Sequence, residues 1–391
     1  MESADVIVIG AGLAGCSVAW HLAPHFKVLV LDQAEQPGAE ATSQNAGMIR
    51  LLGEDPWERA LAVRTAGFLE DPSPDWEGLD LSRRTGALLG LVHEPMHLHD
   101  GVAHLRARGV HVQACDRPGD VSPALGQSRL SIAWYLPEER IADPHALLTG
   151  FLAGARRNKA QLRCGVQVEE LRREGSRLVG VQTNKGFFAA DRVVIAAGAW
   201  SQSLALTAGI SRPLVPLART LLYSKPHPFS SPQHPWTWID DVGIYVRPEA
   251  GGWLSSPCDE TLSLPSSGPG SKGPVDPYHR ALAVDKIERY MPALGEVTFA
   301  GGWTGLRTFA PDRRPILGAD PELDGLWWAA GLGGSGLTCS YGVGEAVSAW
   351  MRGLPTDWLE HTGVSPARAF LSRWPIRPEG DLVQVKLIAS A

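Results

Sequence analysis

The stretch Asp5-Val-Ile-Val-Ile-Gly-Ala-Gly-Leu-Ala-Gly-Cys16 lies almost at the start of the chain. It begins as a β-branched apolar run and continues into glycines, and the residues after it, 17–23, have helical spacing. A second apolar run, Lys27-Val-Leu-Val-Leu-Asp32, follows within the length of one helix. The pattern predicts a strand, a tight turn, a helix and a second strand, which together form a βαβ unit with two parallel strands.

The glycines of this segment, Gly10, Gly12 and Gly15, have the G-x-G-x-x-G spacing of a dinucleotide-binding turn. The first glycine makes the turn, the second lets backbone approach a pyrophosphate, and the third lets the helix pack on the strand. Asp32 ends the second strand, where a carboxylate can accept hydrogen bonds from a ribose. A glycine turn in some other α/β protein is the alternative. Because all the surrounding elements are in register, we predict dinucleotide binding.

Composition narrows the class of protein. The chain has 391 residues, a formal net charge of -6, 44% hydrophobic and 20% charged residues, which is typical of a globular protein with two domains. Mild acidity argues against a dedicated nucleic-acid binder. No stretch approaches the roughly 18 apolar residues of a membrane span. The five cysteines are scattered without CxxC spacing and suggest neither a disulfide framework nor a metal site, so we expect no bound metal. No basic signal-peptide region precedes Asp5, and we therefore expect a cytoplasmic protein.

The pattern of a strand that runs into glycine occurs twice more, at Arg192–Trp200 and Gly325–Leu337. Asp143 and Pro144 predict the start of a helix. From Pro213 to Ala300 the chain reads instead as alternating strands. We therefore expect a mixed α/β and α+β fold, in which a discontinuous Rossmann-like domain carries an inserted antiparallel-sheet substrate domain. The expected bounds are 1–80, 136–212 and 301–360 for the first domain, 81–135 and 213–300 for the second, and 361–391 for a C-terminal tail.

Both NAD and FAD bind to the G-x-G-x-x-G turn, and three later segments favour FAD. Thr42–Met48 offers hydroxyls, an amide and a bare glycine where an extended FAD would pass, although an ordinary polar loop has the same composition. Ala196–Trp200 and Gly331–Thr338 add further glycine-lined backbone. The last of these opens a helix, whose dipole can stabilise a reduced, anionic flavin.

These segments resemble the D-amino acid oxidase-like flavoproteins, which include glycine and sarcosine oxidases and D-amino acid dehydrogenases. The resemblance covers nearly the whole chain, and its most specific stretch is Trp303-Thr-Gly-Leu-Arg-Thr-Phe-Ala-Pro-Asp-Arg-Arg-Pro-Ile-Leu-Gly318. Among the branches of the family, the chain looks most similar to glycine oxidase and D-arginine dehydrogenase. The resemblance implies a flavin domain and a substrate domain whose sheet covers the flavin ring.

The resemblance also implies four residues of the substrate site. Arg307 matches the arginine of the family's G-x-R-x-x-x-P-D segment, which pairs with the substrate carboxylate. Tyr245 resembles the tyrosine that hydrogen-bonds the substrate. Arg50 aligns with a carboxylate-binding arginine of sarcosine oxidases, and Arg219 is similar to a pocket arginine of D-arginine dehydrogenase. A solvated loop arginine at position 50 and a plain strand-edge arginine at position 219 are the alternatives.

The cofactor is expected to be FAD, bound noncovalently, because the attachment cysteine of monomeric sarcosine oxidase has no counterpart near Gly305. The residues expected to contact it are Gly10, Gly12, Leu13, Ala14, Gly15, Asp32, Gln33, Thr42, Ser43, Asn45, Ala46, Gly47, Met48, Val168, Ala197, Gly198, Trp200, Gly305, Arg307, Gly333, Gly334, Ser335, Gly336, Leu337 and Thr338.

The expected reaction is oxidation of an amino acid or N-substituted glycine by hydride transfer from Cα to flavin N5, which gives an imine that hydrolyses to a 2-oxo acid and an amine or ammonia. The electron acceptor is O2 or another oxidant. The absence of a lysine around Trp253, where sarcosine oxidase uses one to speed the reaction with oxygen, favours a dehydrogenase over an oxidase. The segment Arg84–Gly90 lacks the acid that would hold a guanidinium substrate. A 2-hydroxy acid dehydrogenase and a redox-silent FAD-binding subunit are the alternatives.

Overall fold

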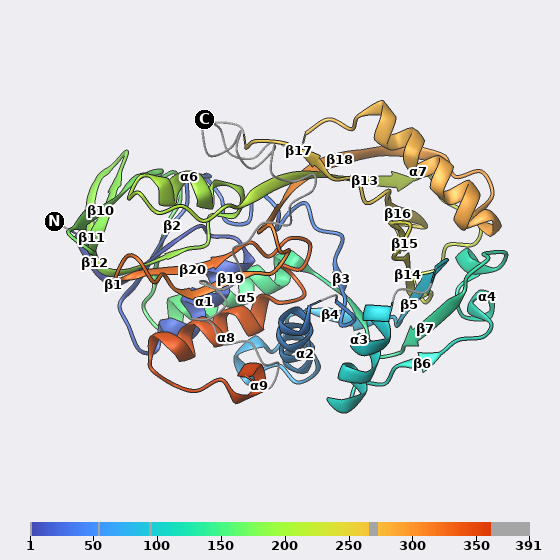
Figure 1. Ribbon diagram of the computed structural model, residues 1–391, viewed down its shortest axis with the longest axis horizontal. Coiled ribbons are helices and arrows are strands. Elements are labelled where there is room, and N and C mark those ends of the chain that lie inside the picture. The colour runs from blue at the N-terminus through green and yellow to red at the C-terminus, as the bar shows by residue number, and fades with distance from the viewer. Residues whose placement is uncertain (1, 54, 94–95, 266–272, 361–391) are drawn as a thin grey trace.

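The computed structural model describes residues 2–53, 55–93, 96–265 and 273–360. The expected C-terminal tail, 361–391, lies outside the described residues. Two large sheets and one small sheet organise the chain (Figure 1). The mixed α/β and α+β architecture confirms the predicted fold class.

The first sheet is built around parallel strands, as the N-terminal pattern predicts. β1 (Glu2–Ile9) lies between β2 (Val28–Leu31) and β12 (Gly186–Ile195), parallel to both. The same sheet continues through the strands β9 (Gln161–Arg163), β10 (Val168–Glu174), β11 (Arg177–Thr183), β19 (Ile316–Ala319) and β20 (Leu326–Ala330). β1 is parallel to β2 and β12, β2 is parallel to β9, and β12 is parallel to β20. The carboxyl ends of these five strands therefore share one edge of the sheet.

Helices cover both faces of this sheet. On one face α1 (Leu13–Leu22) contacts α5 (Pro144–Arg157) and α8 (Ser340–Met351), and α8 also contacts α2 (Pro56–Glu70). On the other face α6 (Ser201–Leu206) packs within a separate apolar core. The predicted helix start at Asp143 is confirmed, because its carboxylate accepts hydrogen bonds from the N–H groups of the first turn of α5.

The second sheet is largely antiparallel and has the order β17 (Thr261–Leu262), β13 (Val215–Ser224), β16 (Gly252–Ser256), β15 (Ile244–Glu249), β14 (Trp236–Ile239), β5 (Ala87–Leu91), β7 (Ile132–Leu136) and β6 (Gln113–Ala114). The helix α7 (Pro277–Tyr290) covers one face and buries Ala283 and Ile287 in a third apolar core. The remaining strands, β3 (Met48–Ile49), β8 (Arg140–Ala142) and β4 (Ser82–Arg84), form a small sheet.

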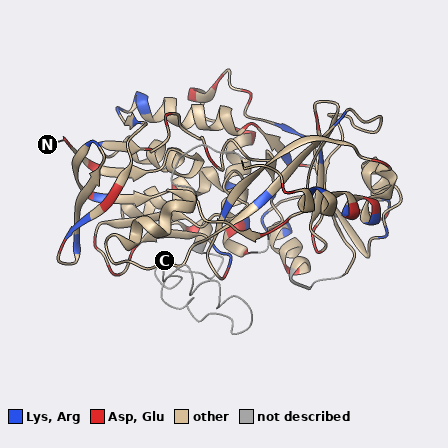
Figure 2. Ribbon diagram, turned by 90° about the horizontal axis from the view of Figure 1, so that it is seen from above, with Lys and Arg blue, Asp and Glu red and all other residues tan. Residues whose placement is uncertain are grey.

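The remaining helices of the described chain are α3 (Met96–Ala107), α4 (Pro118–Val121) and α9 (Asp357–Glu360). Single 3-10 turns are formed by Pro74–Trp76, Pro123–Leu125, Gly198–Trp200 and Pro292–Leu294. In the part of the chain that the structure describes, no helix has the length and apolar character needed to cross a membrane. Figure 2 shows that basic and acidic residues occur together in both halves of the molecule.

The strand β18 (Phe299–Phe309) extends the second sheet beyond the expected domain boundary at residue 300. It pairs with β13 from Val215 to Ser224, so residues 301–309 belong to this sheet rather than to the first one. The reason is that the glycine-rich stretch forms a long antiparallel strand that pairs with β13. Figure 1 shows β13 and β18 running side by side between the two halves of the molecule.

Candidate functional site

The turn between β1 and α1 requires glycine for steric reasons. Gly10 has a φ of +105°, and a Cβ on it would lie 2.3 Å from the carbonyl oxygen of Ala196. A Cβ on Gly15 would lie 1.9 Å from the carbonyl oxygen of Gly10. Both distances are far below van der Waals contact, so the turn forms only with bare backbone at these two positions. The first turn of α1, residues 12–14, consequently lines a cavity.

The carboxylate of Asp32 is fixed at the end of β2 by two backbone donors. Its Oδ2 accepts from the N–H of Ala11 at 2.6 Å and its Oδ1 from the N–H of Ala34 at 2.8 Å. Burial raises the pKa of Asp32, and the two N–H donors oppose that shift. Asp32 and Gln33 both line the cavity, at the edge of the sheet where the ribose of a dinucleotide is expected.

The segment after Asp32 folds back onto the glycine turn. The N–H of Gly38 donates to the carbonyl oxygen of Ala11 at 3.0 Å, and the N–H of Leu13 donates to Oγ1 of Thr42 at 3.1 Å. Ser43 points elsewhere, because its hydroxyl donates to the carbonyl oxygen of Ala39 at 2.8 Å. Thr42 therefore joins the cavity wall at the N-terminus of α1, whereas Ser43 stabilises the loop from behind.

The cavity has a volume of about 1430 Å³, above the ~300–1,000 Å³ of ordinary small-ligand pockets. Of the predicted cofactor contacts, those that line it are Gly10, Gly12, Leu13, Ala14, Asp32, Gln33, Thr42, Asn45, Ala46, Met48, Val168, Ala197, Gly198, Trp200, Gly305, Arg307, Gly333, Gly334, Ser335, Gly336, Leu337 and Thr338. Gly15, Ser43 and Gly47 do not line it and support the wall from behind.

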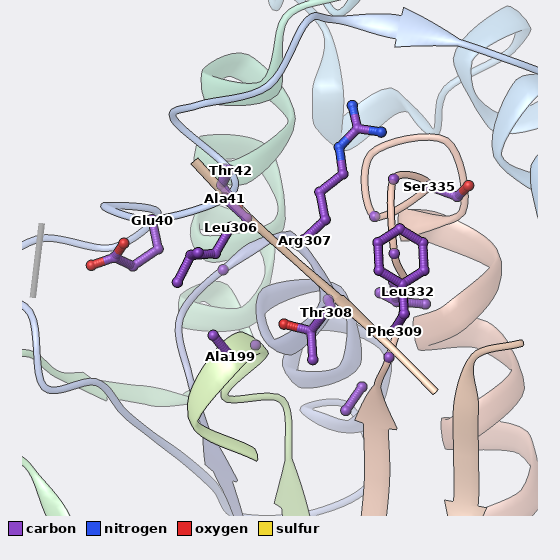
Figure 3. Close-up of a pocket in the computed structure, with 18 of the residues that line it drawn as sticks. Glu40, Ala41, Thr42, Ala199, Leu306, Arg307, Thr308, Phe309, Leu332 and Ser335 are labelled. Carbon is purple, nitrogen blue, oxygen red and sulfur yellow. The ribbon is translucent and has the colours of Figure 1, made fainter. Parts of the chain in front are cut away.

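The loop Gly331–Cys339 lies between β20 and α8 and borders the far end of the cavity. The N–H of Gly333 donates to the carbonyl oxygen of Thr308 at 2.9 Å, and Phe309 forms a β-bridge with Leu332. A Cβ on Gly334 would lie 2.5 Å from Nη1 of Arg307. Figure 3 shows the Arg307 side chain extending past the loop that carries Leu332 and Ser335. The loop is thus attached to β18, and its bare backbone makes room for the guanidinium.

Arg307 is half-buried on β18 and lines the cavity. Its side chain makes no hydrogen bond and no ion pair within the residues 2–53, 55–93, 96–265 and 273–360. Burial, together with the positive charge of Arg219, lowers the pKa of its guanidinium, which nevertheless stays protonated at neutral pH. A cation in this position is set to receive an anion.

Arg219, on β13, also lines the cavity, but it has an acidic partner. Its Nη2 lies 2.8 Å from Oε1 of Glu260, and only 7% of its side chain is exposed. Its Nε is buried without a hydrogen-bond partner in the described part of the chain. The alternative of a plain strand-edge arginine does not describe this environment, since the residue is enclosed at the cavity wall.

Arg50 lines the cavity at the end of β3 and is held by its neighbours. Its Nη2 lies 3.1 Å from Oδ1 of Asp240, and its Nε donates to the carbonyl oxygen of Leu52 at 3.0 Å. Its guanidinium lies 4.3 Å from the ring centre of Trp238. The ion pair with Asp240 balances the charge of Arg50, in contrast to that of Arg307.

Tyr245 lies one layer behind the cavity wall. Its side chain is fully buried on β15 and packs with its ring centre 5.1 Å from that of Trp238. It belongs to a small apolar cluster with Ala46, Leu221 and Leu254, and it is absent from the cavity lining. Burial raises the pKa of its hydroxyl, an effect opposed by the nearby charge of Arg307.

Several cavity residues had no signal in the sequence: Trp238, Asp240, Cys258, Glu260 and Lys286. Lys286 comes from α7, and its Nζ donates to the carbonyl oxygens of Gly243 at 2.9 Å and Pro257 at 2.7 Å. Burial lowers the pKa of this ammonium group. Only the pairing of distant segments brings these side chains together, so no local motif could have identified them.

The observed residues fit an extended FAD. Bare backbone at the glycine turn leaves space for a pyrophosphate, Asp32 lies where a ribose is expected, and one continuous cavity leads from there to Arg307. No group of three or more His, Cys, Asp or Glu side chains within the described residues is arranged to hold a metal ion. Fold and cavity together define a flavin-dependent oxidoreductase.

Comparison with known proteins is consistent with this class. Residues 5–350 match the model of the FAD dependent oxidoreductase family of D-amino acid oxidase type, so the chain belongs to that family. It is 29% identical to the 4-methylaminobutanoate oxidase (formaldehyde-forming) of Paenarthrobacter nicotinovorans, over 88% of this chain but only 43% of that protein. It is 27% identical to the glycine oxidase of Bacillus licheniformis, over 91% and 95% of the two chains.

Among solved structures, the fold is similar to that of L-proline dehydrogenase from P. horikoshii, with a TM-score of 0.82 and 23% identity over 96% of this chain and 100% of the other. The chain is accordingly an FAD-dependent oxidoreductase of the amino acid and amine oxidase type.

Proposed function

We propose that the protein oxidises the C–N bond of an amino acid or N-substituted glycine, giving an imine that water hydrolyses to a 2-oxo acid and an amine or ammonia. The observation that carries this proposal is Arg307, a cation on the cavity wall without a hydrogen-bonding partner of its own in the described residues. A guanidinium fork binds a carboxylate bidentately, and this grip fixes the orientation of the adjoining Cα.

The cofactor in the proposal is held mainly by backbone and by one carboxylate. The turn at residues 10–14 and Asp32 would hold the ADP half, and the loop Gly331–Cys339 would border the flavin. When bound, the flavin supplies a two-electron acceptor to which the Cα hydrogen passes as hydride. A substrate bound as the neutral amine needs no strong base, so the main tasks of the protein are orientation and exclusion of water.

Noncovalent binding of FAD is part of the proposal. Two thiols line the cavity, Cys258 and Cys339, and burial raises the pKa of both, so they stay neutral at physiological pH. A neutral thiol is a poor nucleophile toward a flavin ring. All five cysteines are unpaired, which supports the reducing, cytoplasmic compartment expected from the sequence.

We keep Arg219, Arg50 and Tyr245 as contributors to the substrate site, in decreasing order of structural support. Arg219 reaches the cavity with an unpaired Nε, Arg50 reaches it with its charge paired to Asp240, and Tyr245 supports the wall through Trp238. We also keep the two-domain division, with β18 assigned to the substrate domain.

The test is an anaerobic panel of glycine, sarcosine, longer N-alkyl glycines, D- and L-amino acids and 2-hydroxy acids, with flavin bleaching as the readout. Bleaching by amines with release of a 2-oxo acid and an amine supports the proposal. Bleaching by 2-hydroxy acids alone contradicts it, as does a flavin that no compound reduces. Admission of O2 to the reduced enzyme, with measurement of peroxide, then separates an oxidase from a dehydrogenase.

A further inference from the structure

Arg219 and Arg307 lie on the same face of the β13–β18 ribbon. In the antiparallel register Arg219 is opposite Gly305, and Leu217 is opposite Arg307. Residues two apart on a strand share a face, so the two arginines are diagonal cross-strand neighbours, with Cβ atoms ~7–8 Å apart in such a geometry. Like charges at this distance repel, and the positive charge of Arg219 indeed contributes to the lowered pKa of Arg307.

Among the described residues, one carboxylate, that of Glu260, forms an ion pair with a member of this pair. Glu260 accepts from Nη2 of Arg219 at 2.8 Å and also binds Arg313, with an Nη1 to Oε1 distance of 3.1 Å. Burial favours the protonated form of Glu260, but the hydrogen bond from Arg313 and the charge of Arg219 outweigh this effect and lower its pKa. Glu260 is therefore a charged acid shared between two arginines, and Arg307 is left without a bonded anion.

A third cation lies at the same end of the cavity. Lys286 binds two carbonyl oxygens and makes no ion pair within the described residues. The charge of Arg50 at this end is balanced by Asp240. Arg219 and Arg307 thus share a single ion-paired carboxylate among the described residues, that of Glu260, and the buried Nε of Arg219 has no hydrogen-bond partner there. Burial of a cation or of an unpaired hydrogen-bond donor costs free energy of desolvation unless an anion pairs with it.

We propose that the substrate carries two carboxylates, one bound by Arg307 and the other by Arg219, so that the enzyme acts on an amino or imino diacid. The proposal rests on the function proposed above and specifies its substrate class. Because the two arginines are diagonal neighbours, they match a short diacid of the size of an aspartate, a glutamate or an iminodiacetate. A single carboxylate bridging both arginines is the competing arrangement.

The first test uses binding by the FAD-loaded enzyme and needs no turnover. Succinate and glutarate are titrated against their monoamides, succinamate and glutaramate, and the change in flavin absorption gives each Kd. The diacids are expected to bind at least ~10-fold more tightly than the monoamides of the same shape, since a charge-assisted bond is replaced by a neutral one. Equal affinities for diacid and monoamide would overturn the two-carboxylate assignment.

The second test locates that preference at Arg219. In Arg219→Gln the ratio of monoamide Kd to diacid Kd should fall toward one. In the control Arg289→Gln, a change at an exposed arginine of α7, the ratio should keep its wild-type value. Arg219→Lys keeps the charge but loses the fork, so it should retain a reduced preference, and it replaces Arg219→Gln if that variant does not load FAD. An unchanged ratio in both Arg219 variants would contradict the assignment.

A third measurement separates failure of this inference from failure of the proposed function. Glutamate is compared with glutamine, aspartate with asparagine, and iminodiacetate with sarcosine in anaerobic bleaching. If amines bleach the flavin but acid and neutral partners react equally, the diacid inference fails and amine oxidation stands. If no amine bleaches it while succinate still binds better than succinamate through Arg219, amine oxidation fails and the two-carboxylate site stands.

Discussion

The two ends of the cavity are lined by different chemical groups: backbone at one end and charged side chains at the other. At the end proposed to hold the nucleotide, the wall is backbone shaped by glycines that a single methyl group would disrupt, and the carboxylate of Asp32 is fixed there by backbone N–H groups. At the substrate end the wall consists of long charged side chains, among them Arg219, Arg307 and Lys286, which come from β13, β18 and α7. We therefore expect the proposed cofactor site to tolerate almost no change in the shape of its wall. The proposed substrate site should depend instead on the balance of charge.

The sharpest test of this contrast is Gly15→Ala. The added Cβ would lie 1.9 Å from the carbonyl oxygen of Gly10, so the turn has to open or the helix has to move. We expect loss of nearly all bound flavin, measured as the flavin-to-protein absorbance ratio of the purified protein. Gly67→Ala, in α2 with nothing within 4 Å of the added Cβ, is the matched control and should retain its flavin. A yellow Gly15→Ala protein would break the comparison.

The next effect in size concerns Arg307→Gln. Loss of the guanidinium removes the proposed carboxylate grip but leaves the glycine turn intact, so flavin content should stay normal. We expect kcat/KM for the best substrate to fall by about 10²–10³, equivalent to ~3–4 kcal/mol. Arg50→Gln should cost less, because Asp240 already balances the charge of Arg50. Equal losses in the two variants, measured by steady-state kinetics, would contradict the assigned difference.

A smaller effect is expected at Asp32, at the end of the cavity proposed to hold the nucleotide. In Asp32→Asn the amide can no longer accept from both Ala11 and Ala34, and the charge at the expected ribose position is lost. We expect the Kd for FAD to rise ~10–100-fold, the equivalent of ~1.5–3 kcal/mol, by fluorescence titration of the apoprotein. The exposed Asp191→Asn serves as control. A Kd unchanged by Asp32→Asn would show that the backbone alone holds the nucleotide.

The smallest effect concerns the wall behind Arg50. Glu139 is fully buried, accepts from the N–H of Leu51 at 2.8 Å, and burial raises its pKa from 4.5 to about 8. The folded protein therefore holds a proton that the unfolded chain releases above pH 4.5. Stability from this group is full below that pH, declines between pH 4.5 and 8, and is lost above about pH 8, with a slope of at most ~1.4 kcal/mol per pH unit.

Thermal unfolding of Glu139→Gln across pH 5–9 tests this expectation. The variant carries no titrating group at this position, so its Tm relative to wild type should rise with pH. Its half-exposed neighbour, Glu138→Gln, is the control and should follow the wild-type curve. Parallel curves for Glu139→Gln and wild type would contradict the raised pKa.

The strand, glycine turn and helix at the N-terminus were predictable because their requirements are local. The spacing of Gly10, Gly12 and Gly15 and the position of Asp32 follow from a strand, a turn and a helix that are contiguous in the sequence. The helix start at Asp143 was predictable for the same reason. In these cases a short stretch of chain contains all the sterics that determine its structure.

The substrate end was predicted only where a family resemblance supplied the residue, as for Arg307. Glu260 and Lys286 reach the cavity through strand register and helix packing, and their own segments carry no motif. Residues 301–309 were expected in the first domain, yet Gly301 and Gly302 allow β18 to pack tightly beside β13. Charge balance among distant side chains is a property of the assembled sheet, and so it is absent from any local pattern.

The attachment of the Gly331–Cys339 loop to β18 couples this loop to the strand that carries Arg307. Arg307 lies one residue before Thr308, whose carbonyl oxygen holds Gly333, and Phe309 bridges to Leu332. A ligand that binds the guanidinium therefore lies next to the backbone that holds this loop, which is proposed to border the flavin. We therefore expect the absorption spectrum of the bound flavin to change when a ligand binds. The affinities of ligands that are never oxidised can then be compared by absorption spectroscopy.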